Sequence, residues 1–216
     1  MNLNYDGQFE EIKKRRAGSR LLLHVCCAPC ATYCLTRVLD AFDVTLYFHN
    51  DNVFPLTEWE KRLNEVRRLA EIVNGGNFET RALSPLKLEV KPFDYDVFLQ
   101  YAKGLERQRE GGLRCAACFE MRLDATAKHA KEHGFDLFGT TLTVSPYKNS
   151  ALLNQVGERA AAKYGAAFLY SDFKKRGGYN ESIRLSQKYA LYRQHYCGCS
   201  FSLAQLPQPD VDATAR

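Results

Sequence analysis

Residues 21–30 read LLLHVCCAPC, and the rest of the chain can be placed relative to this stretch. Its first five residues form an apolar run with the length and composition of a buried strand. Cys26 and Cys27 follow at once, and Pro29 suits the first turn of a helix that continues through ATYCLTRVLDAF, residues 31–42. The stretch therefore predicts a strand, a turn and a helix, with two adjacent cysteines at the carboxyl end of the strand.

Strands and helices alternate along the remaining sequence. Apolar and β-branched runs predict further strands at residues 44–49, 78–83, 135–144 and 166–170. Helical spacing of apolar residues predicts helices at 57–74, 93–105, 115–133, 152–164 and 181–196. A capping box from Thr57 to Glu60 marks one helix start, and Gly75-Gly76 marks the end of that helix. This alternation predicts an α/β fold, a parallel sheet with helices on both faces.

In such a fold, ligands bind at the carboxyl ends of the strands. The Cys26-Cys27 pair lies at the end of the first predicted strand. The loops 140–149 and 172–180 follow later strands. We therefore expect these three segments to converge on one edge of the sheet.

The length of 216 residues suits one domain with a modest insertion. We expect a single α/β domain at 20–206, in which the segment 84–114 interrupts the pattern as an insertion or lid. Residues 1–19 are predicted to be a charged tail or capping segment, and residues 207–216 a C-terminal tail.

The composition excludes several classes of protein. Hydrophobic residues make up 45% and charged residues 25%, which rules out a wholly disordered chain, a collagen and a coiled coil. No apolar run reaches the length of a membrane span, so no membrane association is expected. The formal net charge of +5 permits a polyanionic partner without requiring one.

The eight cysteines are clustered, at positions 26, 27, 30, 34, 115, 118, 197 and 199. The polar N-terminal segment has no apolar core typical of a signal peptide, so a secreted disulfide scaffold is not expected. In a reducing, cytoplasmic setting, clustered thiols indicate metal ligands or redox catalysts.

Cys26 and Cys27 together with Cys115-x-x-Cys118 form the main chemical signal. Four thiolates can hold an iron–sulfur cluster or a zinc ion. Adjacent cysteines are uncommon in structural zinc sites, which favours a four-iron cluster. The alternative is two packing cysteines beside a small zinc site.

The other four cysteines allow several roles. Cys30 is either a further ligand, to the same centre or to a neighbouring metal, or a thiol at a helix start. Cys34 lies one turn further along and is predicted to pack in the core. A disulfide between Cys197 and Cys199 would close a strained, easily reduced ring, which favours a redox pair over two more ligands.

A basic segment with aromatic neighbours precedes the last two cysteines. Cations beside aromatic rings suit contacts with phosphates and bases, although a solvated helix face explains this segment equally well. His24 is expected to be a satisfied core histidine, and Asp51 and Asn52 part of a loop. The sequence carries neither G-x-G-x-x-G after the first strand nor G-x-x-x-x-G-K-[ST], so nucleotide sites of those kinds are not supported.

Four motifs in this order resemble the QueH-type epoxyqueuosine reductases, with similarity over about residues 20–203. They are LLLHVCCAPC (21–30), RCAACFEMRL (114–123), GTTLTVSPYKN (139–149) and DFKKRGGYNESIRLSQKYALYRQHYCGCSFS (172–202). The resemblance implies a Rossmann-like fold of the HUP type. It also implies a cobalamin-independent enzyme that reduces the epoxide of epoxyqueuosine in the tRNA anticodon loop to give queuosine.

The resemblance further implies a set of site residues. Cys26, Cys27, Cys115 and Cys118 would hold a 4Fe–4S cluster, Cys30 would lie near a second mononuclear iron, and Cys197 and Cys199 would form the redox-active disulfide. Electrons would come from a donor that the sequence does not identify. As a hypothesis, the tRNA path is lined by Tyr147, Lys148, Lys174, Lys175, Arg176 and Tyr179.

Two other functions remain open at this point. The thiols also suit a non-enzymatic metal–thiolate redox sensor or tRNA-binding module. Cys115 and Cys118 alone would suit a thiol–disulfide oxidoreductase.

Overall fold

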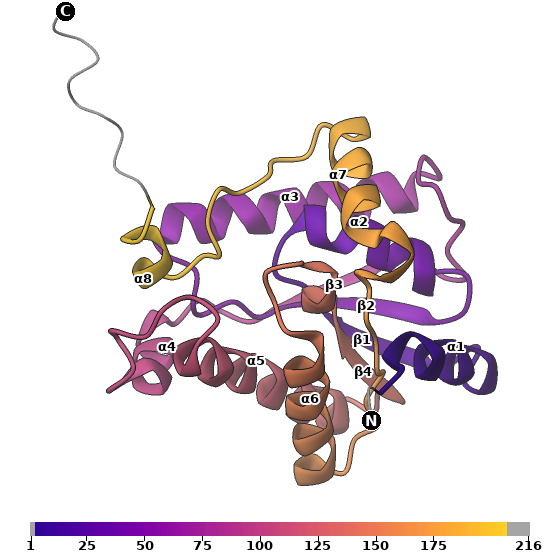
Figure 1. Cartoon of the computed structure of the whole chain (residues 1–216). Coiled ribbons are helices and arrows are strands. Elements are labelled where there is room, and N and C mark those ends of the chain that lie inside the picture. The colour runs from indigo at the N-terminus through magenta and orange to yellow at the C-terminus, as the bar shows by residue number, and fades with distance from the viewer. Residues whose placement is uncertain (1–2, 207–216) are drawn as a thin grey trace, which may run out of the picture.

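The computed structural model describes residues 3–206, which form a four-stranded, all-parallel sheet flanked by helices (Figure 1). The strand order is β3-β2-β1-β4. The strands are β1 (Arg20–His24), β2 (Asp43–Phe48), β3 (Lys87–Val90) and β4 (Leu137–Thr140). The predicted α/β class and parallel sheet are therefore confirmed.

Eight α-helices and two short 3-10 helices lie within residues 3–206. The α-helices are α1 (Tyr5–Arg15), α2 (Ala28–Val38), α3 (Leu56–Asn74), α4 (Tyr95–Ala102), α5 (Leu113–Glu132), α6 (Ser150–Tyr164), α7 (Gly178–Lys188) and α8 (Ser200–Leu203). The 3-10 helices are η1 (Thr141–Val144) and η2 (Lys175–Gly177).

The central strand β1 sorts its side chains between two apolar layers. Leu21 and Leu23 pack into the core formed with α2 and α3, whereas Leu22 packs with Ala127 of α5 and Ala160 of α6. This alternation follows from the two-residue period of a strand. It places α2 and α3 on one face of the sheet and α5 and α6 on the other (Figure 1).

Two of the predicted strands are wrong. Residues 78–83 form bends and irregular backbone, because Leu83 N–H pairs with the carbonyl of Leu39 at the end of α2 rather than with a strand. Residues 166–170 contribute only an isolated bridge between Phe168 and Phe138. Here the side chain of Asn154 on α6 bonds both backbone groups of Ser171, which a longer strand would have used.

The edge strand β3 lies inside the segment 84–114 that was predicted to be an insertion. Its residues are mostly half-buried, and it pairs in parallel with β2 from Lys87 to Val90. The same segment also holds α4 and the start of α5. Part of the predicted insertion is therefore integral to the sheet.

The N-terminal segment, expected to be a tail or capping segment, holds α1. This helix forms because Tyr5 and Phe9 are buried, and the Phe9 ring meets Phe173 edge-on at 5.3 Å. The C-terminal tail predicted at 207–216 lies outside the described residues.

Several predicted boundaries also shift. The strand predicted at 135–144 gives way to η1 after Thr140, and α3 begins at Leu56 without the expected side-chain cap. The helix predicted at 181–196 is shorter than expected, because α7 ends at Lys188. Two residues later, Ala190 has a φ of 49°, in the left-handed region. Within residues 3–206, no helix combines the length and apolar character needed to cross a bilayer.

Candidate metal and thiol site

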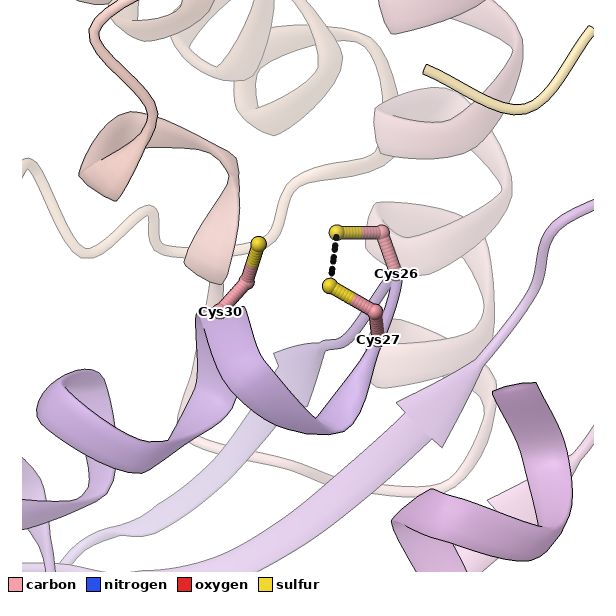
Figure 2. Close-up of side chains that lie close together, drawn as sticks. All are labelled: Cys26, Cys27 and Cys30. Atoms are coloured by element: carbon pink, nitrogen blue, oxygen red, sulfur yellow. Dashed lines mark hydrogen bonds between the residues drawn. The ribbon is translucent and has the colours of Figure 1, made fainter. Parts of the chain in front are cut away.

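Cys26, Cys27 and Cys30 form a compact thiol group at the turn from β1 into α2 (Figure 2). The sulfur atoms of Cys26 and Cys27 lie 3.6 Å apart, and all three sulfurs lie within 4.8 Å of one another. Cys27 is the N-cap of α2 in an extended conformation, which turns both adjacent side chains the same way despite their neighbouring positions. We call this group the turn thiols.

The turn thiols share their protons unequally. Hydrogen bonds from Cys27 and Cys30, and the nearby charges of Lys148 and Arg122, hold the pKa of Cys26 well below its usual value. Burial raises the pKa of Cys27 to about 12, and bonding to Cys26 and Cys27 raises the pKa of Cys30 well above its usual value. Cys26 therefore loses its proton most readily of the three, because like charges this close do not ionise together without a cation.

Cys115 and Cys118 lie one turn apart at the start of α5. Cys118 is buried, and burial raises the pKa of its thiol to about 12. Arg122, one turn further along, donates from Nη2 to the Cys118 sulfur at 3.3 Å. The backbone N–H of Gly111 donates to the Cys115 sulfur at 3.2 Å.

Cys197 and Cys199 lie on either side of Gly198, just before α8. Gly198 has a φ of +140°, and a Cβ there would come within 3.3 Å of Asn52, Val53 and Arg62. Only glycine therefore fits between the two thiols. Cys199 caps α8, its sulfur accepting from Ser202 N–H at 3.3 Å, and both cysteines are free thiols.

The irregular segment 189–199, which we call the strap, is held against α3 by side-chain bonds. Buried Arg62 donates to the carbonyls of Cys197 at 3.0 Å and Tyr196 at 3.3 Å, and to the carboxylate of Glu58 at 2.8 Å. Glu65 accepts from Tyr192 N–H at 2.8 Å. Helix α3 thus replaces the backbone partners that a continued helix would have supplied.

One side chain of the strap reaches the turn thiols. Gln194 donates from Nε2 to the Cys27 sulfur at 3.1 Å. Its Oε1 atom is buried and has no partner among the described residues. The strap thus contacts the turn thiols directly.

Two adjoining cavities connect the thiol groups. The larger cavity, of about 460 Å³, is lined by Cys26, Cys30 and Cys197. A narrow second cavity is lined by four thiols, those of Cys115, Cys118, Cys197 and Cys199. Glu110, Arg122 and Cys197 line both. The structure therefore brings seven of the eight cysteines to one region, at the carboxyl end of β1.

The eighth cysteine and the polar residues near the turn have structural contacts. Cys34 is fully buried, and its sulfur donates to the Cys30 carbonyl at 3.2 Å, as expected of a packing cysteine. His24 is fully buried between Thr140 and the His49 carbonyl, and burial lowers its pKa to about 3. The prediction of a satisfied core histidine is confirmed.

The six residues predicted to line a tRNA path divide into two groups. Tyr147, Lys148 and Tyr179 line the larger cavity. Burial lowers the pKa of Lys148, but the surrounding cysteines outweigh this and raise it.

The other three predicted residues face elsewhere. Lys174 donates to the backbone carbonyl of Lys148 at 3.0 Å and does not itself line the larger cavity. Lys175 lines a separate cavity beside α1, and Arg176 forms ion pairs with Asp6 and Glu10 of that helix. These contacts give Lys175 and Arg176 no direct part in the thiol region.

Sequence reasoning missed several residues of the site. Arg122 and Arg114 are buried beside the thiols, and Gln194 and His195 line the larger cavity. Spacing could have identified Arg122, since it lies one helical turn after Cys118. The strap residues carry no such signal, because tertiary contacts alone fix their positions.

The donor set fits a metal–thiolate centre. Sulfur ligands select iron–sulfur clusters, zinc or other soft metals, and both thiol groups are largely withdrawn from solvent. Gln194 and Arg122 already donate hydrogen bonds to the sulfurs of Cys27 and Cys118, as outer partners do in metal sites. A bound metal would displace the shared protons of the turn thiols.

Comparison with known proteins gives a consistent result. A protein-family model described as "Epoxyqueuosine reductase QueH" matches residues 21–205. A relative of that name from Staphylococcus epidermidis is 42% identical, over 93% of this chain and 84% of the relative. Relatives of the same name from Staphylococcus aureus and Thermotoga maritima are each 38% identical, over 94% and 91% of this chain and 85% and 96% of the relatives.

Proposed function

This chain belongs to the QueH family of epoxyqueuosine reductases, and from that premise we propose that it reduces epoxyqueuosine in tRNA to queuosine. The family match over residues 21–205 carries this proposal. The larger cavity is the substrate site, because it combines thiols, cations and aromatic rings at the carboxyl end of a parallel strand. We further propose that the fold is Rossmann-like and of the HUP type, which the all-parallel order 3-2-1-4 supports.

The thiols divide into two metal sites in this proposal. Cys115, Cys118, Cys197 and Cys199 hold a 4Fe–4S cluster, and the turn thiols hold a second, mononuclear iron. Two observations support this division: four thiols line one narrow cavity, and three thiols lie within 4.8 Å of one another at the turn.

The main alternative assigns the same thiols differently. Cys26, Cys27, Cys115 and Cys118 would hold the cluster, Cys30 would lie near the second iron, and Cys197 and Cys199 would form a redox-active disulfide. Replacing Cys197 by serine separates the two divisions. Loss of cluster iron and sulfide supports Cys197 as a ligand, whereas an intact cluster with slow re-reduction supports the disulfide.

Removing an epoxide oxygen as water takes two electrons and two protons. When bound, the iron centres supply electrons and Lewis acidity toward the oxygen. The chain's own residues surround the substrate. The Lys148 ammonium lines the larger cavity beside Cys26 and Cys30, where it can orient a polar oxygen and donate a hydrogen bond to it.

The entrance of the larger cavity suits an unpaired nucleotide. Tyr147 is 77% exposed and Tyr179 also lines the cavity, so both rings are available for stacking on a base. Arg193 adds a cation at the same cavity. The proposed substrate contacts are therefore Lys148, Tyr147, Tyr179 and Arg193. The partner is a tRNA anticodon loop, and an external protein or small molecule is the electron donor. A cytoplasmic location follows from that substrate.

Mass spectrometry of tRNA nucleosides tests the activity. The gene should restore queuosine to a strain that lacks epoxyqueuosine reduction, and the anaerobically purified protein should contain iron and acid-labile sulfide. Continued accumulation of epoxyqueuosine would contradict the proposal. Iron and sulfide without turnover would point instead to a redox sensor or tRNA-binding module.

A further inference from the structure

Three arginines are almost fully buried, and they differ in their partners. Arg62 forms an ion pair with Glu58 at 2.8 Å. Arg114 and Arg122 are 1% and 2% exposed, and neither forms an ion pair with a carboxylate anywhere in residues 3–206. An unpaired buried charge is costly, and arginine does not escape that cost by losing its proton. Both groups therefore need an anion nearby.

Arg122 faces the thiols of both cavities. Its Nη2 atom donates to the Cys118 sulfur at 3.3 Å, and its Nε atom donates to the Cys118 carbonyl at 3.3 Å. It also lies near Cys197 and Cys26, and it lines both cavities. Its guanidinium charge is thus directed at sulfur atoms rather than at an acidic side chain.

Arg114 approaches the four-thiol cavity from the first turn of α5. Its Nη1 atom donates to the carbonyl of Glu106 at 2.7 Å, which fixes the side chain. The Nε and Nη2 atoms are buried and have no partner among the described residues. The guanidinium also stacks over Phe201 at 4.7 Å and lines the cavity with Cys115 and Cys199. Arg114 therefore lines the cavity and keeps two donor atoms without a partner.

The charges of the cavity balance when a metal cluster is present. The core of an oxidised four-iron cluster offsets only half of the negative charge of four thiolates, and reduction adds another electron. Two guanidinium groups supply the missing positive charge. Glu110 also lines the cavity, but it is exposed and accepts a hydrogen bond from Ser202 at 2.8 Å, so water screens its charge.

We propose that Arg114 and Arg122 are the counter-charge of the cluster at the four-thiol cavity and raise its reduction potential. The proposal rests on the proposed function, since it takes the cavity to hold a cluster. Net charge and hydrogen bonds to sulfur both set the potential of such a centre. Hydrogen-bond donors that are already in place favour the reduced form of the cluster, because they do not have to rearrange when the electron arrives.

The test compares holoproteins purified anaerobically. Arg114→Gln, Arg122→Gln and the double variant should retain iron and sulfide but show a lower midpoint potential in a titration followed by electron paramagnetic resonance. The double variant should show the largest shift. Arg159→Gln, which removes an exposed arginine from α6, should match the wild-type protein. Glutamine variants that keep the wild-type potential would overturn the proposal.

Lysine variants decide the outcome if a glutamine variant does not fold or assemble a cluster. Arg114→Lys and Arg122→Lys keep the positive charge, so these variants should hold iron and sulfide. Their midpoint potential should still be lower than that of the wild-type protein, because lysine lacks the planar set of N–H donors that arginine has. A folded lysine variant that assembles no cluster would show that charge is not the function of the residue. A wild-type protein without iron would overturn both proposals, whereas a wild-type cluster without tRNA turnover would overturn only the proposed reaction.

Discussion

The turn thiols and the strap present cysteines to the same region by different means. The turn is built from adjacent residues on a strand end and a helix start, and the buried side chain of Asn50 supports it by donating to the Val25 carbonyl at 2.8 Å. The strap has no regular secondary structure from Leu191 to Cys199. Side chains of α3 hold it instead.

This difference separates two ways of placing a ligand. The backbone of β1 and α2 fixes the turn thiols, so mutations of distant residues should leave them in place. The strap is held against α3 by bonds that span more than 120 residues, such as those from Arg62 and Glu65. We therefore expect the two groups to respond differently to the same perturbation.

The largest effect should follow from removing a proposed metal ligand at the turn. Cys27→Ser replaces a buried sulfur that lies 3.6 Å from Cys26 and accepts from Gln194. Because outer partners of a metal are worth about 10- to 100-fold, loss of a ligand should lower turnover by more than about 100-fold. Iron content and queuosine formation measure the effect.

Cys34→Ala is the matched control for this variant. Cys34 lies on the same helix α2 and is fully buried, but its sulfur donates to a backbone carbonyl. This variant should keep its iron and lose only stability. Equal loss of iron in both variants would show that the turn responds to packing rather than to ligation.

Breaking the strap should have the next largest effect. Arg62→Met keeps an unbranched apolar side chain but removes the bonds to Glu58, Tyr196 and Cys197. Breaking a buried ion pair leaves an uncompensated charge, so the free energy of unfolding should fall by about 3–5 kcal/mol. Chemical denaturation measures this fall.

The same variant also tests the comparison directly. In metal-free Arg62→Met, alkylation of Cys197 should accelerate relative to alkylation of Cys26, as followed by peptide mass spectrometry. Arg67→Met, which changes an exposed residue of the same helix, should alter neither quantity. Equal acceleration at both cysteines would mean that α3 supports the turn as well as the strap.

The same contrast explains what the sequence could predict. The strand at 20–24, the cysteine turn and the helix starting at Cys115 follow from local patterns, and they were predicted within a few residues. The end of α7 was not, because the carbonyls of Tyr189 and Ala190 accept from Arg68 of α3. Long-range side-chain bonds of this kind leave no periodic trace in the sequence.

Similar competition accounts for the misplaced strands. The segment near residue 168 resembles a strand, yet Asn154 takes the adjacent backbone groups. The real edge strand, Lys87–Val90, is short and only half-buried, so it lacks the apolar run that marks a strand. The motifs singled out the cysteines, but tertiary contacts decide which of them meet around one cavity.

A smaller effect should follow from cutting the contact between strap and turn. Gln194→Met removes the hydrogen bond to the Cys27 sulfur while keeping a similar volume. Iron affinity should fall by about 10-fold, the lower range for outer partners of a metal. Competition with a chelator measures this change.

Gln187→Met, on the exposed face of α7, is the control for that change. Its iron affinity should equal that of the wild-type protein. If Gln194→Met also keeps its affinity, the strap and the turn act as independent supports for their metals.

The smallest effect should come from acid, and it should act on the strand end beside the turn. Buried Asp51 accepts from His49 at 3.0 Å and from Lys91 at 2.7 Å. Burial raises the pKa of Asp51, but these two partners outweigh it and lower the pKa overall.

A lowered folded pKa means that the stabilisation is complete above the unfolded value, about 3.9, and is lost as pH falls through the folded value. We therefore expect the wild-type protein to have a higher free energy of unfolding than Asp51→Asn. This difference should be constant from neutral pH to about pH 5 and should shrink below about pH 4. Asp96→Asn, at an exposed position on α4, should show no such trend. If the difference between wild type and Asp51→Asn did not change with pH, the support that Asp51 gives to the strand end would be steric rather than ionic.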